Sequence, residues 1–394
     1  MAKGKPRVEL LRFGNWPLFR VILLWVVLAL IVFTLLGWLW GKGVFWTWDR
    51  FLTNWRNAGK DVTGLDVIKV SLTTIGGIGG TGYLVIKYRE RASAESVAAE
   101  QRLHNAVGHL GGESPQIRIA GVYSLAYVAD TFKGDYRQRV VNILCGYLRT
   151  KRGTWESVTD ANASASEPAT KKVYVSHDGA VESTVIEVLG KHLRKHRKSS
   201  AIEQAVRDDQ LWCDCTIDLH GAIITELANF ECVTFTANVS FKGATFTTDA
   251  SFKDATFIGT TSFERTIFTS PASFECATFT TDANFECVTF TANVSFKGAT
   301  FTTDASFKDA TFIGTTSFER TIFTSPASFE CATFTTDANF MDATFNEKHR
   351  EDILFPPRLR LDNATHLPLG ARWARFDDKG NIIKWIFPVG FSAS

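Results

Sequence analysis

Hydrophobic and polar positions divide the chain into three stretches with different periods. Residues 21–40, "VILLWVVLALIVFTLLGWLW", carry no charge. Between about 92 and 200, apolar residues such as Val122, Leu125 and Val128 recur at intervals of three and four, which is typical of helices that bury one face. From Phe230 to Phe345, twenty-two phenylalanines alternate five and six residues apart. The pattern therefore predicts a membrane segment, a helical region and a repeat.

The first stretch predicts a transmembrane helix at 21–40, because twenty helical residues measure about 30 Å, the thickness of a bilayer's hydrocarbon core. A second transmembrane helix is predicted at 65–87, where five glycines allow close helix packing. A Gly-rich turn between soluble elements is the alternative for that segment. Residues 1–20 predict a cytoplasmic basic tail, and residues 41–64, rich in Trp, an aromatic interfacial loop.

The distribution of Lys and Arg predicts the orientation of this helical hairpin. Nine of these residues flank the two predicted spans on the outer sides and four lie in the loop between them. Positive charge favours the cytoplasmic side, so both ends are expected in the cytoplasm. The expected location is the cell membrane, multi-pass, with the repeat domain cytoplasmic. The seven cysteines lack the spacing of a disulfide scaffold and fit a reducing compartment.

The helical region offers weak candidates for chemistry. His192 and His196 are four residues apart on a predicted helix, a spacing that can hold a metal, but they lie among five cations without a nearby carboxylate. Cys213 and Cys215 lack a second Cys or His pair. The basic run around the histidines fits a solvated helix end, with anionic lipid or RNA as alternative contacts. We therefore expect no catalytic residue, metal or cofactor.

Two boundaries complete the helical region, which spans 92–200. Ser114 with Pro115 predicts a capped helix start, since both residue types are favoured at those positions. Residues 151–172 are small, polar and aperiodic, so they predict a loop or linker.

The repeat at 211–346 is better explained by strands than by helix. Its unit is eleven residues, close to F-x-x-A-T-F-T-x-x-A-S. On a helix, a five-residue step would place successive phenylalanines about 140° apart, so they would share no seam. Thr and Ser are poor helix formers, and a β-solenoid stacks equivalent side chains at a strand spacing of about 4.8 Å.

The segments "ATFTT", "ASFKD" and "ANFEC" resemble the pentapeptide repeat. That resemblance implies a right-handed quadrilateral β-helix with four faces per coil. Every second step here carries one extra residue, such as Asp249, so the implied coil has twenty-two residues and consists of two 11-residue half-coils. Roughly five and a half coils would form a rod of about 26 Å at the strand spacing. The fold class expected for the whole chain is mixed: transmembrane hairpin, small α-helical region and β-helix.

The phenylalanines are expected to point inward as structural ladders, together with the residue two positions before each. The first ten ladder residues are Phe230, Phe235, Phe241, Phe246, Phe252, Phe257, Phe263, Phe268, Phe274 and Phe279.

An internal duplication supports the half-coil as the unit. Residues 228–282 recur identically as residues 283–337, a shift of fifty-five, which is five units of eleven but two and a half coils. Each duplicated residue should therefore lie on the opposite face of the solenoid. Cysteines forty-four apart should lie two coils apart, too far for a disulfide.

The upstream segments "VGHLGGESPQIRIAGVYSLAYVAD" and "LWCDCTIDLHGAII" look like the helical segment of bacterial membrane-anchored pentapeptide-repeat proteins. Trp212 and residues 217–222 are expected to open the solenoid, and residues 347–394 to form an irregular C-terminal cap or tail.

The predicted function is a non-catalytic protein–protein interaction or scaffold module at the cytoplasmic face. The expected partners are the membrane lipid bilayer and an unidentified protein; nucleic acid and a small-molecule substrate are disfavoured, because the formal net charge is only +2 and no convergent site is seen. The alternative is a DNA-mimic solenoid that binds a type II topoisomerase. From Phe230 to Phe345 there are thirteen acidic and six basic residues, so this segment has the net negative charge that mimicry of DNA requires.

Overall fold

The computed structural model describes residues 64–159, 170–195, 206–356, 359–362, 365–377 and 380–386, together with Val27 and Ile31. The chain divides into two compact units, Met1–Glu100 and Gln101–Ser394. The predicted basic tail, the interfacial loop and, apart from those two residues, the predicted transmembrane helix at 21–40 lie outside the described residues.

The first described element is α3 (Gly64–Leu110), one helix of 47 residues. It continues through the five glycines, so a Gly-rich turn there is wrong. Within the part of the chain that the structure describes, no helix is long and apolar enough to cross a membrane. The predicted second transmembrane helix at 65–87 is therefore not supported. The segment is helical, but its glycines contribute little apolar surface, and the helix runs on into a charged sequence.

Three further helices form the helical region: α4 (Pro115–Phe132), α5 (Gly134–Arg149) and α6 (Gly179–Leu193). The N-cap of α4 is Ser114, whose Oγ accepts from the backbone N–H of Ile117 at 3.3 Å. The apolar stripes of the three helices face one another, with Val122, Leu144 and Leu189 fully buried. The capping residues named from the sequence are thus confirmed.

The prediction that residues 151–172 form a loop or linker is wrong at both ends of that range. Strands β1 (Gly153–Thr159) and β2 (Thr170–Ser176) pair in antiparallel register, with Trp155 opposite Tyr174. Their rings meet edge to face at 5.3 Å between centroids. Both strands contain β-branched and aromatic residues, but each is short and the composition between them is typical of a loop.

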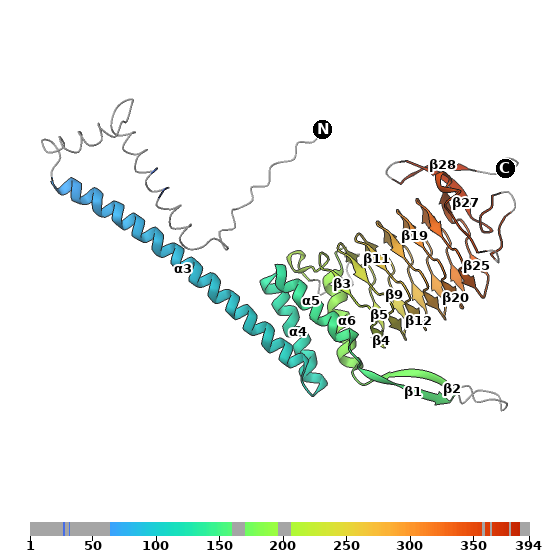
Figure 1. Ribbon diagram of the computed structural model, residues 1–394, viewed down its shortest axis with the longest axis horizontal. Helices are drawn as coiled ribbons and strands as arrows, with labels where there is room; N and C mark the ends of the chain where they lie inside the picture. Colours follow the sequence, from blue (N-terminus) through green and yellow to red (C-terminus); the bar gives the residue numbers. More distant parts are fainter. Residues whose placement is uncertain are drawn as a thin grey trace, which may run out of the picture. The chain divides into compact units, whose positions relative to one another are not determined.

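The C-terminal β-solenoid is confirmed, and its coils have four faces (Figure 1). Face 1 consists of β3 (Ile217–Asp218), β7 (Val239–Ser240), β11 (Thr261–Ser262), β15 (Ala283–Asn284), β19 (Ala305–Ser306) and β23 (Ala327–Ser328). Face 2 consists of β4 (Ile223–Ile224), β8 (Thr245–Phe246), β12 (Ile267–Phe268), β16 (Thr289–Phe290), β20 (Thr311–Phe312) and β24 (Thr333–Phe334).

The other two faces complete each coil. Face 3 consists of β5 (Ala228–Asn229), β9 (Ala250–Ser251), β13 (Ala272–Ser273), β17 (Val294–Ser295), β21 (Thr316–Ser317) and β25 (Ala338–Asn339). Face 4 consists of β6 (Thr234–Phe235), β10 (Thr256–Phe257), β14 (Thr278–Phe279), β18 (Thr300–Phe301), β22 (Ile322–Phe323) and β26 (Thr344–Asn346). The first coil begins at Ile217, before the first ladder phenylalanine, so there are about six coils rather than five and a half.

Strand register confirms the twenty-two-residue coil. Phe257 pairs in parallel with Phe279, and Thr261 pairs with Ala283. The duplication also behaves as expected. Ala228 lies on face 3 and its copy Ala283 on face 1, on the opposite side of the coil. The two halves of a coil are therefore structurally equivalent.

Regular elements close both ends of the solenoid. At the N-terminal end, η2 (Asp208–Gln210) leads to the first coil, against which α5 and α6 pack (Figure 1). At the other end, η3 (Glu347–His349) follows β26. There β27 (Arg372–Phe376) adds in parallel to β26, and β28 (Ile382–Ile386) adds antiparallel to β27. The predicted irregular cap is thus wrong in part, because a hairpin extends face 4.

Candidate functional site

The ten ladder phenylalanines lie in the solenoid core. Each has an exposed fraction of 2% or less, and rings on one face stack coil upon coil, as Phe257 does on Phe279 at 4.6 Å between centroids. Ladders from opposite faces meet in the middle, where Phe252 and Phe263 make an edge contact at 5.4 Å. Offset and edge contacts of this kind are the favoured geometries of aromatic pairs. The ladder therefore builds the rod and offers no side chain to a partner.

The outer surface repeats small polar side chains at the coil spacing. Faces 1 and 3 carry mostly Ser, and faces 2 and 4 mostly Thr. A groove of about 710 Å³ lies along face 3. Its polar lining includes Asp249, Ser251, Ser273, Glu275, Asn293, Ser295, Ser317 and Asp337. The groove offers hydrogen-bond donors and acceptors in register over successive coils.

The charged side chains at two corners of the coil are largely paired with each other. Lys242 Nζ lies 2.7 Å from Glu264 Oε2 on the next coil, and Lys308 Nζ lies 2.9 Å from Glu330 Oε2. The hydrogen bond and charge of Glu330 raise the pKa of Lys308. Such exposed pairs add little stability, but they offset part of the acidic charge at these corners. The net negative charge of the repeat is therefore not an unbroken acidic row.

The same corners contain the backbone residues with positive φ. Each corner is a β-turn, such as that closed by Ala255 N–H donating to Phe252 O at 3.1 Å, and its third residue is left-handed. Gly is favoured in that position, yet Cys, Asp and Arg also occur here. The left-handed corner residues are Gly221, Cys232, Gly243, Asp254, Arg265, Cys276, Cys287, Gly298, Asp309, Arg320, Cys331 and Asp342.

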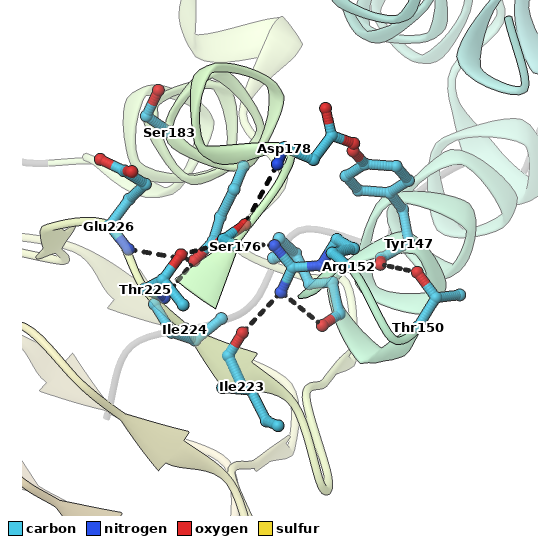
Figure 2. Close-up of polar contacts among 12 residues, drawn as sticks. Tyr147, Thr150, Arg152, Ser176, Asp178, Ser183, Ile223, Ile224, Thr225 and Glu226 are labelled. Carbon is cyan, nitrogen blue, oxygen red and sulfur yellow. Dashed lines mark hydrogen bonds and ion pairs between the residues drawn. The ribbon is translucent and has the colours of Figure 1, made fainter. Parts of the chain in front are cut away.

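A buried ion pair joins the helical region to the first coil. Arg152 follows α5, and its guanidinium donates to the carbonyl oxygens of Leu148 at 2.9 Å and Ile223 at 2.6 Å (Figure 2). It also pairs with the carboxylate of Glu182 on α6. Arg152 is 8% exposed and Glu182 fully buried. Because both charges are removed from water, each depends on the other.

Glu182 also binds the solenoid directly. Its Oε1 accepts from the backbone N–H groups of Thr225 at 2.5 Å and Glu226 at 3.1 Å, and its Oε2 accepts from Thr225 Oγ1 at 2.9 Å. These donors lie in the turn after β4. The pair therefore fixes the position of the solenoid on the helices.

A second polar cluster binds the segment before the first strand. The indole of Trp212 stacks on His192 at 3.9 Å between ring centroids and donates to Asp130 Oδ1 at 3.1 Å. The imidazole places one nitrogen 2.7 Å from Val188 O and the other 3.3 Å from Asp130 Oδ2. Both ring nitrogens of this metal candidate face protein oxygens. The other candidate, His196, lies outside the described residues.

The buried cysteines are held as thiols. Burial raises the pKa of Cys145 to about 12, of Cys213 to about 11 and of Cys215 to about 12. A cysteine acts as a nucleophile in its thiolate form, so these raised pKa values disfavour that role near neutral pH. Within the described residues, no group of three His, Cys, Asp or Glu could hold a metal ion.

We expect the stability of the chain to fall as the pH rises above about 9. The unfolded thiols lose their protons near the ordinary thiol pKa of 9.0, whereas the folded ones keep theirs to about 11 or 12, so unfolding releases protons in that window. Urea unfolding at pH 8 and pH 10.5 measures the difference. Cys145→Ala should reduce the pH dependence, and an unchanged dependence would contradict the assignment.

The comparisons identify the repeat. A family model of pentapeptide repeats (9 copies) matches residues 219–267 and 263–311. No curated protein and no solved structure matches the chain. A solenoid of this kind suggests a non-catalytic protein-interaction module. With the four-faced coil and the family match in agreement, the chain belongs to the pentapeptide-repeat protein family.

Proposed function

We propose that the chain is a membrane-anchored, non-catalytic interaction or scaffold module whose solenoid binds a protein partner at the cytoplasmic face. The anchor in this proposal is the apolar segment 21–40. The bias of Lys and Arg supports the cytoplasmic orientation. Without support for a second span at 65–87, the proposal assigns no multi-pass topology.

The observation that carries the proposal is the repeated polar surface of a rigid rod. The Phe ladders fill the inside of the coils with stacked, buried rings, and the Arg152–Glu182 pair connects the first coil to the helices. A partner would meet rows of hydroxyl and amide groups whose positions are set before binding. Preorganised groups lose less entropy on association, which favours affinity.

The corner ion pairs weigh against DNA mimicry. A mimic of DNA needs acidic side chains that present charge along the rod, as phosphates do. Here Glu264, Glu319 and Glu330 each pair with a lysine on the preceding coil. These pairs interrupt the acidic rows at two corners of the coil, although the six basic residues of the repeat leave a net charge of minus seven.

Site-specific photo-crosslinking in membranes tests the proposal. A photoreactive amino acid is placed at one position on each face, in the consecutive strands β21 to β24: Ser317, Ile322, Ser328 and Thr333. Specific binding should give a discrete adduct from one or two faces. Adducts of equal intensity from all four faces, or from none, would contradict a specific protein partner. Mass spectrometry of the adduct band identifies the partner.

A further inference from the structure

The C-terminal end of the solenoid is covered on two faces by residues that continue the ladders. On face 1, Phe329 N–H donates to Leu354 O at 2.7 Å, and the ring of Phe355 stacks on Phe329 at 5.7 Å. On face 4, β27 pairs with β26, and Trp373 contacts Phe345 at 6.3 Å. On both faces, an aromatic residue takes the place that the next ladder phenylalanine would occupy.

Face 3 is partly covered. Asp342 N–H donates to Gly370 O at 2.9 Å, and Phe340 is only 1% exposed. The last ladder residue of this face is therefore shielded from water, although β25 itself pairs only with β21 among the described strands.

Face 2 ends in an open strand edge. Among the described residues, β24 pairs only with β20, through the N–H groups of Thr333 and Thr335. In the preceding coil, the carbonyls of Ala310 and Phe312 accept these two bonds. The equivalent carbonyls in the last coil belong to Ala332 and Phe334, and no described residue donates to them. Such an edge is a template for one more strand.

The ladder of face 2 is also incomplete. The ring of Phe334 stacks on Phe312 at 4.6 Å with an interplanar angle of 3°, but Phe334 is only partly buried whereas Phe312 is fully buried. A cavity of about 510 Å³ lies beside Phe334. Its lining includes Ala332, Phe334, Pro356, Leu359 and Leu369. Thr333, Thr335, Asp337 and Arg360 also line this cavity, so it combines apolar and polar groups beside the open edge.

We infer that this edge binds an extended peptide segment of another protein. The segment adds one parallel strand to β24, its N–H groups donate to the carbonyls of Ala332 and Phe334, and one aromatic side chain stacks on Phe334. Continuity with the ladder specifies this chemistry, because the missing element is a strand with one aromatic ring that points into the core. The inference rests on the proposed interaction function and locates the docking site. Strand addition of this kind takes affinity from the main chain and specificity from the pocket.

A peptide copied from the repeat tests the inference. The probe is fluorescein-labelled KDATFIGTT, residues 308–316, which contains one phenylalanine, and its control carries Phe312→Ser. Fluorescence anisotropy measures binding to the full chain in detergent micelles. Loss of the buried ring should weaken binding about tenfold or more.

Two matched variants of the protein locate the binding site. Leu369→Glu introduces a charge at the cavity from a residue that is 49% exposed, so the fold should tolerate it. Leu227→Glu places the same change at a residue of similar exposure, 58%, on the face 3 groove. Binding should weaken about tenfold or more in Leu369→Glu and stay unchanged in Leu227→Glu. Circular dichroism confirms folding, and Phe334→Ser serves as a second cavity variant.

Several results would overturn the inference. These are absence of peptide binding, equal binding of the Phe and Ser peptides, and loss of binding in Leu227→Glu alone. Self-association of the chain that Leu369→Glu abolishes, measured by analytical ultracentrifugation, would assign the edge to a second copy instead. Partner adducts on faces 1, 3 or 4 without peptide binding would leave the proposed function in place and remove only this docking site.

Discussion

Glu182→Ala is expected to lower the free energy of unfolding by about 3–5 kcal/mol, because it leaves the Arg152 guanidinium buried without its counter-charge. The same change removes the acceptor of the Thr225 and Glu226 N–H groups at the first coil. Chemical denaturation followed by far-ultraviolet circular dichroism measures the loss. The helices and the first coil should then unfold in separate transitions, because the buried ion pair and hydrogen bonds that connect them are lost.

Two controls make this prediction specific. Glu187→Ala breaks the exposed pair with Lys191 on the same helix and should cost less than about 1 kcal/mol. The double variant Arg152→Met, Glu182→Leu removes both charges together and should recover most of the loss, because no buried charge is left alone. A double variant as unstable as Glu182→Ala would show that the lost hydrogen bonds to Thr225 and Glu226, rather than the unpaired charge, are the cause.

Phe252→Ala and Phe307→Ala are each expected to cost about 3–5 kcal/mol, the usual range for a large aromatic residue removed from a packed core. The two residues are copies fifty-five positions apart, both fully buried, on opposite sides of the coil. If the half-coils are equivalent, the two losses should agree within about 0.5 kcal/mol. Denaturant unfolding of both variants and of the unmodified chain gives the comparison.

Phe334→Ala provides the contrasting case. This ring is only partly buried and stacks on one neighbour of its own ladder, Phe312. Its removal should cost clearly less than that of Phe252. Equal losses at Phe252 and Phe334 would mean that the ladder is not the main source of stability.

The repeat could be predicted because its core residues recur at a regular spacing along the sequence. One large side chain points inward per face, and a corner with one extra residue follows every second face, so the five–six alternation fixes the coil length. The duplication by fifty-five then reports the equivalence of half-coils. Local sequence is sufficient here because every coil contacts only its neighbours.

The junction could not be predicted in the same way. Arg152 and Glu182 are thirty residues apart and meet only when α5 and α6 pack on the first coil. In the sequence, Glu182 is an ordinary acidic residue in the first turn of a helix, where the dipole favours it. Its burial depends on tertiary packing, which no local pattern encodes.

The C-terminal hairpin was missed although a signal was present. "RFDDKGNIIKW" contains a turn sequence between two short segments with apolar and aromatic residues, and Gly380 has the positive φ that the turn requires. The β1–β2 hairpin lacked such a signal, because a ten-residue polar segment separates its strands. Both cases show that short strands outside a repeat are identified by their partner and not by their own sequence.

Deletion variants of the solenoid test the half-coil claim most directly. Removing residues 283–293 takes out one 11-residue half-coil and keeps the five–six alternation, whereas removing residues 286–290 takes out five residues and breaks it. Thermal unfolding followed by circular dichroism is measured for both. The half-coil deletion should retain the β spectrum and a cooperative transition, and the five-residue deletion should lose them. A half-coil deletion as disruptive as the shorter one would contradict the equivalence on which the fold described here depends.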